Sequence, residues 1–373
     1  MRGALWTEEP ERGSAVLIRL MIWVALRLGW PTGQVLLYPI TAYFYLFLRG
    51  TRRASRDFLA RALGRNATGR DVFRHLFTFS CVLFDRIFLL SNRLEHFTID
   101  VTGLACLEAI LAEQRGCILI GSHLGSFEVL RAVARQSPTP VNVLMYRANN
   151  GPYSRLVERL DPTLSDRIIE IGTPEAMLHV RESLERGEMV GILADRAPAG
   201  QKMIAVSFLS APASLPTGPW ALCAALGAPV VLLFGVRTAP RRYSVHFEPF
   251  ADRIVLERSR RAEDIADWVA RYAQHLETQC RAHPFNWFNF YEFWEKVPDV
   301  APPARPRPAI GDPVAATACS GRAPRRIDAD AGPHPGETCK LHRGKDPRRV
   351  DPTAERDRPI VLSATRAPRE NHP

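Results

Sequence analysis

The sequence predicts an α/β fold, a mixed sheet flanked by helices, for the central part of the 373-residue chain. Short apolar runs typical of buried strands alternate with segments whose apolar residues recur at helical spacing. This alternation stops near residue 299, after which prolines and charged residues dominate. We therefore expect one folded domain over residues 51–299, between an N-terminal segment, residues 1–50, and a C-terminal tail, residues 300–373.

The apolar spacing predicts amphipathic helices between residues 55 and 98, then a helix at 104–114 and a strand at 117–121. The remaining elements are expected in this order: a helix at 125–136, a strand at 141–146, a helix at 152–160, a strand at 168–171, a helix at 174–186, a strand at 189–194, a long loop at 195–216, a helix at 217–227, strands at 229–236 and 243–248, and a helix at 262–281. This alternation predicts an α/β domain with a mixed sheet flanked by helices.

The N-terminal segment contains an uncharged stretch, residues 28–48, that is long enough to cross a bilayer as a helix. Pro31 and Pro39 would kink or break such a helix. Two membrane arrangements stay open, a single transmembrane helix and an apolar hairpin that enters one leaflet, and a buried core helix is the soluble alternative. An arginine cluster follows directly and predicts a cytosolic location for the rest of the chain: Arg49, Arg52, Arg53, Arg56 and Arg61.

Composition limits the other classes of partner. The net charge is +10, but the chain lacks zinc-finger, ribonucleoprotein and basic-zipper signatures, so nucleic-acid binding is not expected. The seven cysteines form no C-x-x-C pair, which favours reduced thiols and predicts no metal site. The tail carries 13 of the 30 prolines and little apolar periodicity, so we expect it to be disordered.

The sequence ILIGSHLGSFEVL, residues 118–130, places His123 and Glu128 where an apolar strand gives way to a helical pattern. A carboxylate near the imidazole can accept a hydrogen bond from one ring nitrogen and leave the other free to take a proton. A buried histidine satisfied by a nearby carboxylate is the structural alternative. The pattern therefore indicates a candidate general base.

Three further stretches carry polar or loop-forming residues at or after strand ends. LMYRANN contains Arg147, LADRAP contains Asp195 and Arg196, and FLSAPASLPTGP, residues 208–219, is rich in small residues and proline. In open α/β sheets, ligands bind outside the carboxyl ends of strands. Each stretch alone would also fit a surface loop or an ion pair, but together with His123 they predict one site.

As a set, HLGSFE, MYRANN, ADRAP and FLSAPASLPTGP resemble the lysophospholipid acyltransferase superfamily, in particular its bacterial lipid A late acyltransferase-like branch. The aromatic stretch PFNWFNFYEFW, residues 284–294, is similar to the terminal signature of a related group of predicted membrane acyltransferases. From the residues alone, core packing is favoured over an acyl-chain groove for this stretch, and contact with the bilayer surface is a further alternative.

The resemblance implies roles for individual residues. His123 would be the general base with Glu128 as its orienting partner, and Arg147 would lie near the donor's carbonyl or phosphate groups. Asp195 and Arg196 would shape or bind the same site. The loop that binds the acceptor would contain Phe208, Pro216 and Gly218. The chain departs from the family pattern at Ser210, where that loop usually carries glycine.

The function that this resemblance implies is acyl transfer at a membrane. A fatty acyl group would move from acyl-carrier protein or acyl-coenzyme A to a hydroxyl or amine of a membrane lipid or lipid precursor, without a cofactor. The site would face the cytosol at the bacterial inner membrane. The chain has no G-x-S-x-G elbow, which favours direct transfer, with Arg147 or backbone N–H groups near Gly125 stabilising the oxyanion. A thioesterase- or lipase-type hydrolase and an inactive membrane scaffold are the alternatives.

Overall fold

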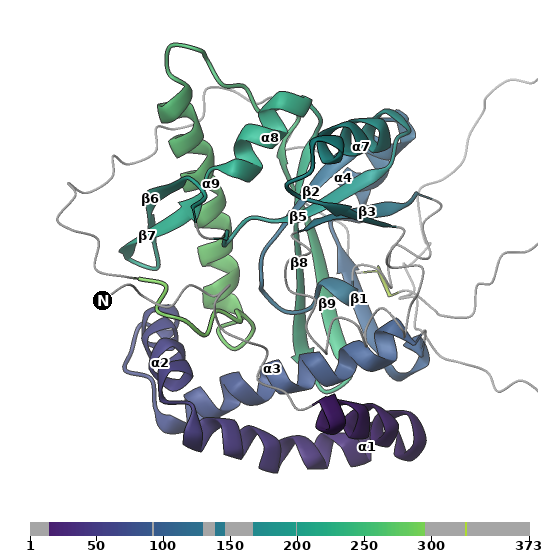
Figure 1. Cartoon of the computed structure of the whole chain (residues 1–373), viewed down its shortest axis with the longest axis vertical. Helices are drawn as coiled ribbons and strands as arrows, with labels where there is room; N and C mark the ends of the chain where they lie inside the picture. Colours follow the sequence, from purple (N-terminus) through teal and green to yellow (C-terminus); the bar gives the residue numbers. More distant parts are fainter. Residues whose placement is uncertain are drawn as a thin grey trace, which may run out of the picture.

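The computed structural model describes residues 15–91, 93–129, 139–145, 167–198, 200–294 and 325–326. The predicted α/β fold is confirmed, because one mixed sheet is flanked by helices (Figure 1). Seven strands follow the order β1-β9-β8-β2-β5-β3-β4, and the two-residue β10 (Arg325–Arg326) pairs with β1. Their bounds are β1 (Thr98–Thr102), β2 (Cys117–Gly121), β3 (Val141–Met145), β4 (Ile168–Glu170), β5 (Met189–Leu193), β8 (Val230–Ala239) and β9 (Arg242–Ala251).

The central strand β2 positions the site. It pairs in parallel with β5 on one side and β8 on the other, so Ile120 lies between Ile192 and Leu232. All five residues of β2 are buried, which explains why its sequence is continuously apolar rather than alternating. The carboxyl ends of β2 and β5 therefore meet at the same edge of the sheet, while β8 continues further, to Ala239.

Helices surround this sheet, and their bounds are α1 (Ala15–Phe47), α2 (Arg49–Leu63), α3 (Gly69–Leu90), α4 (Leu104–Ala112), α7 (Pro174–Glu185), α8 (Gly218–Leu226) and α9 (Arg261–Ala282). A 3-10 turn, η1 (Leu94–His96), precedes β1. Capping residues in the sequence set where the helices start and end. Thr68 and Asp71 form a reciprocal capping box at the start of α3, and Gly64 in the left-handed conformation ends α2.

The N-terminal apolar stretch forms α1, which bends at Gly29, where φ is 81°. Figure 1 shows α3 between α1 and the sheet. The buried side of α1 includes Leu37 and Thr41, and the Thr41 hydroxyl donates to Ser80 Oγ of α3 at 3.1 Å. Among the described residues, no helix combines the length and the apolar character needed to cross a bilayer.

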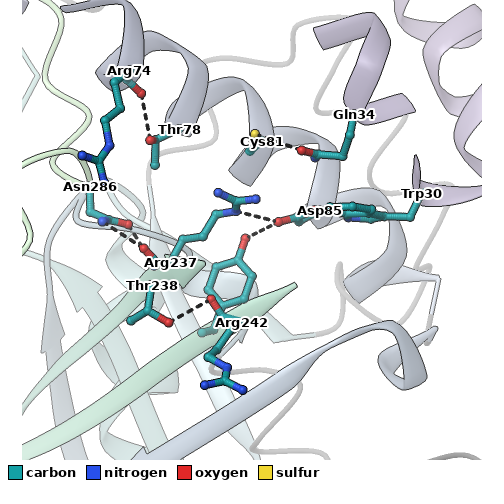
Figure 2. Close-up of polar contacts among 11 residues, drawn as sticks. Trp30, Gln34, Arg74, Thr78, Cys81, Asp85, Arg237, Thr238, Arg242 and Asn286 are labelled. Carbon is teal, nitrogen blue, oxygen red and sulfur yellow. Dashed lines mark hydrogen bonds and ion pairs between the residues drawn. The ribbon is translucent and has the colours of Figure 1, made fainter. Parts of the chain in front are cut away.

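A buried carboxylate connects this helical layer to the sheet (Figure 2). Asp85 of α3 accepts hydrogen bonds from Trp30 Nε1 of α1 at 2.7 Å, from Tyr243 Oη of β9 at 2.8 Å and from Arg237 Nε of β8 at 3.2 Å. Burial raises the pKa of Asp85, and these three donors oppose that rise. Because an unpaired buried charge is costly, the contacts fix the position of α1 and α3 relative to β8 and β9.

Two regions of the chain, which contain three strands, differ from the sequence-based expectations. The predicted loop at 195–216 contains a hairpin of β6 (Met203–Phe208) and β7 (Ala211–Pro216), which Figure 1 shows beside α9. Strand β1, at the far side of the sheet, was not expected at all. The predicted helix at 152–160 lies outside the described residues, as does the tail except for β10, and the predicted helix at 125–136 is described only to residue 129.

The hairpin turn makes a first prediction. Leu209 and Ser210 have φ values of 49° and 63°, as a two-residue type I′ turn requires. A side chain in this conformation costs about 1 kcal/mol, which glycine avoids. Ser210→Gly should therefore raise the free energy of unfolding by about 1 kcal/mol in denaturant titrations. Ser214→Gly, within β7, should instead lower it, and a Ser210→Gly variant less stable than the wild type would contradict this explanation of the turn.

Candidate functional site

His123 lies in a tight turn that follows β2. Gly125 in this turn has a φ of 74°, and a Cβ atom there would lie 2.0 Å from the carbonyl oxygen of Gly235 in β8. Ser126 N–H donates to the same carbonyl at 2.7 Å, so the turn rests directly on the neighbouring strand. The glycine is therefore required by both the backbone conformation and the close approach. This packing fixes where His123 leaves the sheet.

The carboxylate that contacts the imidazole is that of Asp195. Its Oδ1 lies 2.8 Å from His123 Nδ1, and its Oδ2 accepts from the His123 backbone N–H at 3.0 Å. Asp195 follows β5, the strand next to β2, so the sheet itself brings the two residues together. The Asp195 side chain is fully buried, whereas 30% of the His123 side chain is exposed.

Two further donors reach Asp195 from the aromatic stretch near the end of the domain. Trp287 Nε1 and Asn289 Nδ2 donate to Oδ2 at 3.1 and 3.3 Å. Sequence reasoning missed both residues. The sequence signal that could have indicated them is the presence of two polar residues, Asn286 and Asn289, in the otherwise aromatic run from Phe285 to Phe290. Both asparagines are buried in the structure. Core packing of this stretch is confirmed, because Trp287 and Phe293 are buried.

Arg196 contacts the same ring nitrogen as Asp195. Its Nε lies 2.8 Å from His123 Nδ1 and is placed to donate to it. A neutral imidazole cannot use one nitrogen as donor and acceptor at once. We assign the proton to Nδ1, donated to Asp195, because a fully buried carboxylate needs donors. Arg196 then acts through its charge, and Nε2 keeps its lone pair.

The charges at the site favour a neutral imidazole beside an ionised carboxylate. Burial lowers the pKa of His123, the Arg196 guanidinium lowers it further, and Asp195 opposes both effects. Burial alone would raise the pKa of Asp195, but His123 and Arg196 outweigh this and hold it well below its usual range. A neutral histidine with one oriented N–H and one free lone pair can act as a general base.

Glu128 lies elsewhere than the sequence-based prediction requires. Its Oε1 pairs with Arg86 Nη2 of α3 at 2.6 Å, and its Oε2 accepts from Ser126 Oγ at 3.2 Å. Within the described part of the chain, Glu128 has no hydrogen bond with His123. The difference arises because the helix after Ser126 directs Glu128 toward α3, whereas β5 delivers Asp195 to the imidazole.

The remaining residues predicted for the site have no hydrogen bond with His123 among the described residues. Phe208 is buried, and its ring centroid is 5.3 Å from that of Trp287. Pro216 ends β7 and Gly218 begins α8, where neither has a hydrogen bond with His123 among the described residues. Arg147 lies outside the described residues.

The predicted oxyanion donors near Gly125 are already engaged. Gly125 N–H donates to the Asn286 carbonyl at 2.7 Å and Ser126 N–H to that of Gly235 at 2.7 Å, so these two groups are not free to bind an oxyanion. The cation beside the imidazole is Arg196. In the described ranges, no cluster of three or more His, Cys, Asp or Glu side chains is arranged to hold a metal ion. The chemistry that these residues can perform is proton transfer with electrostatic support.

Residues 72–296 match the sequence model of a family described as bacterial lipid A biosynthesis acyltransferase. The matched region includes most of α3, the sheet from β1 to β9, and the segment that carries Trp287 and Asn289. A comparison with curated proteins gives no match. The match covers more than half of the chain and contains the whole His123–Asp195 site, which agrees with the family that the sequence resembles. The chain is therefore an acyltransferase and belongs to the bacterial lipid A biosynthesis acyltransferase family.

Proposed function

We propose that this acyltransferase moves a fatty acyl group from an acyl thioester to a hydroxyl or amine of a membrane lipid or lipid A precursor, with His123 as general base. The observation that carries the proposal is the 2.8 Å contact between His123 Nδ1 and the buried carboxylate of Asp195. This contact orients the ring and leaves Nε2 for the acceptor. We assign to Asp195 the orienting role that the sequence first suggested for Glu128.

In this mechanism the acceptor's hydroxyl or amine attacks the thioester carbonyl while His123 Nε2 takes its proton. A carbon–oxygen or carbon–nitrogen bond forms, and the negative charge on the carbonyl oxygen is stabilised by Arg196, or by Arg147. Collapse of this intermediate breaks the carbon–sulfur bond, and the proton on Nε2 passes to the leaving thiolate. General-base catalysis of this kind contributes about 10²–10⁴-fold to the rate.

Membrane attachment is part of the proposal and rests on the outer face of α1. Large apolar side chains with exposed fractions above one half lie on this helix: Trp23 54%, Leu28 53%, Val35 67%, Tyr38 55%, Tyr43 58%, Leu46 61% and Phe47 67%. Exposed arginines follow at once in α2, namely Arg49, Arg53 and Arg56. An apolar helical face bordered by cations suits the interface of an anionic leaflet. Helix α3 contacts α1 and, through His75 Nε2, the backbone of Trp287 beside the site, so the acceptor is proposed to enter from that leaflet.

The donor is proposed to be acyl-carrier protein or acyl-coenzyme A, and the location the cytosolic side of the bacterial inner membrane. The net charge of +10 favours an acidic or phosphorylated donor by steering its approach. This favours acyl-carrier protein slightly, and both donors are supplied in the assay below.

The assay measures transfer of labelled acyl groups from each donor to total lipid extract by membranes that contain the protein. His123→Ala should reduce labelled lipid by about 10²–10⁴-fold. Asp195→Asn should cause a loss of similar size, because the amide cannot hold the same imidazole tautomer. Glu128→Gln should cost less, since Glu128 contacts Arg86 and Ser126.

Three outcomes would contradict parts of the proposal. A larger loss in Glu128→Gln than in Asp195→Asn would return the orienting role to Glu128. Equal activity in His123→Ala and the wild type would move the chemistry to another site. Labelled free fatty acid without labelled lipid would favour a thioesterase or lipase over a transferase.

The charge of Arg196 makes a prediction about pH dependence. His123 acts as a base only when neutral, so activity should fall at low pH as the imidazole becomes protonated. Arg196 lowers the pKa of His123, and Arg196→Gln should therefore raise it and move the acidic limb of kcat/KM to higher pH. Arg196→Lys keeps the charge and is the matched control, in which the limb should shift less. A limb that moves to lower pH in Arg196→Gln would contradict the assigned electrostatics.

A further inference from the structure

We infer that Trp287 is a positioning residue for the His123–Asp195 pair, which it holds through its indole N–H and through the backbone on either side of it. This inference depends on the proposed function only in assigning the His123–Asp195 pair to acyl transfer. The contacts that support it are all within the chain itself.

The indole acts on the carboxylate. Asp195 is fully buried, and its Oδ2 accepts from Trp287 Nε1 at 3.1 Å as well as from Asn289 Nδ2 and the His123 backbone. With Oδ2 held by these donors, Oδ1 is directed at His123 Nδ1. Loss of the indole donor would leave the carboxylate freer to rotate and its negative charge less compensated.

The backbone around Trp287 acts on the turn that carries His123. Phe288 N–H donates to the His123 carbonyl at 2.8 Å, and the Asn286 carbonyl accepts from Gly125 N–H at 2.7 Å. Leu124 and Trp287 thereby form an antiparallel bridge. One short segment thus contacts both members of the pair, the carboxylate by a side chain and the histidine by its main chain.

The segment is itself held on two sides. The Asn286 side chain accepts from the Arg237 backbone N–H at 2.9 Å and donates to the Arg237 carbonyl at 3.2 Å, as Figure 2 shows. The Trp287 carbonyl contacts His75 Nε2 of α3 at 2.9 Å, and His75 Nδ1 contacts Ser55 Oγ of α2 at 2.9 Å. Burial lowers the pKa of His75 to about 4, so the ring is neutral near pH 7 and can donate to the Trp287 carbonyl.

A purely structural role for Trp287 is the competing explanation, since its ring packs against Phe58, Phe208 and Phe293. The chain provides a control in Trp220 of α8, which is also fully buried in the same hydrophobic core. Among the described residues, Trp220 Nε1 has no hydrogen-bond partner. Replacing either tryptophan with phenylalanine therefore removes a similar buried volume. Only the change at Trp287 also removes a hydrogen-bond donor to the Asp195 carboxylate.

The experiment compares Trp287→Phe with Trp220→Phe in the full chain. The titration of His123 is followed by NMR of imidazole-labelled protein, with His123→Ala used to assign the signal, and kcat and KM are measured by acyl transfer. We expect Trp287→Phe to raise the pKa of His123, because loss of a donor makes its surroundings more negative. We expect kcat to fall about tenfold with KM for the donor unchanged, and Trp220→Phe to alter neither quantity.

The NMR titration separates this inference from the proposed function. If the wild type transfers no acyl group, the proposed function fails, but the shift of the His123 signal in Trp287→Phe still tests the positioning role. Asn289→Leu removes a second donor to the same oxygen and should shift the titration in the same direction, which covers the case in which Trp287→Phe does not fold. An unshifted titration in the folded variant, or the same shift in Trp220→Phe, would overturn the inference.

Discussion

The arrangement of the site depends on one constraint, the burial of an ionised carboxylate at the end of β5. Removing a charge from water costs several kcal/mol unless hydrogen bonds replace the lost solvation. Asp195 obtains those bonds from the turn after β2 and from the segment that contains Trp287 and Asn289. Three parts of the chain that are far apart in sequence must therefore meet at this carboxylate. The hydrogen bonds that compensate the charge of Asp195 also orient His123.

A second buried carboxylate, Asp85, plays a comparable structural part nearer α1. Its donors come from α1, β8 and β9, so it joins the outer helix to the sheet. The two carboxylates are linked through Arg237, whose side chain contacts Asp85 and whose backbone pairs with Asn286, next to Trp287 (Figure 2). The helices proposed to contact the bilayer are thus connected to the site by a continuous set of polar contacts. This gives a physical basis for a fixed orientation of the site relative to α1.

Local sequence patterns predicted the elements on which the site is built. The strand at 117–121 was predicted with the bounds that the structure gives, because a central parallel strand is apolar on both faces. The hairpin at 203–216 was not, since its prolines and small residues hide the alternation that marks a strand. Its turn forms with Leu209 and Ser210 in place of the glycines that such turns favour.

The partner of His123 shows why sequence spacing has limits. Glu128 is close along the chain and was the natural choice, yet side-chain direction after a turn decides contact. Asp195 was recognised as part of the site, but its pairing with His123 follows from β2 and β5 being neighbours, which no local pattern encodes. The roles of Trp287 and Asn289 were hidden for a similar reason. Their aromatic surroundings predicted packing, which is correct, while their hydrogen bonds depend on a residue about ninety positions away.

The balance of charges around His123 explains how this partly exposed histidine can serve as a base. Asp195 raises the pKa of His123, whereas burial and the Arg196 guanidinium lower it further than Asp195 raises it. The carboxylate therefore contributes orientation, and the adjacent guanidinium offsets part of its effect on the pKa. Because Asp195 and Arg196 are consecutive, the end of a single strand supplies both effects. Both opposing charges therefore lie next to the imidazole, each 2.8 Å from His123 Nδ1.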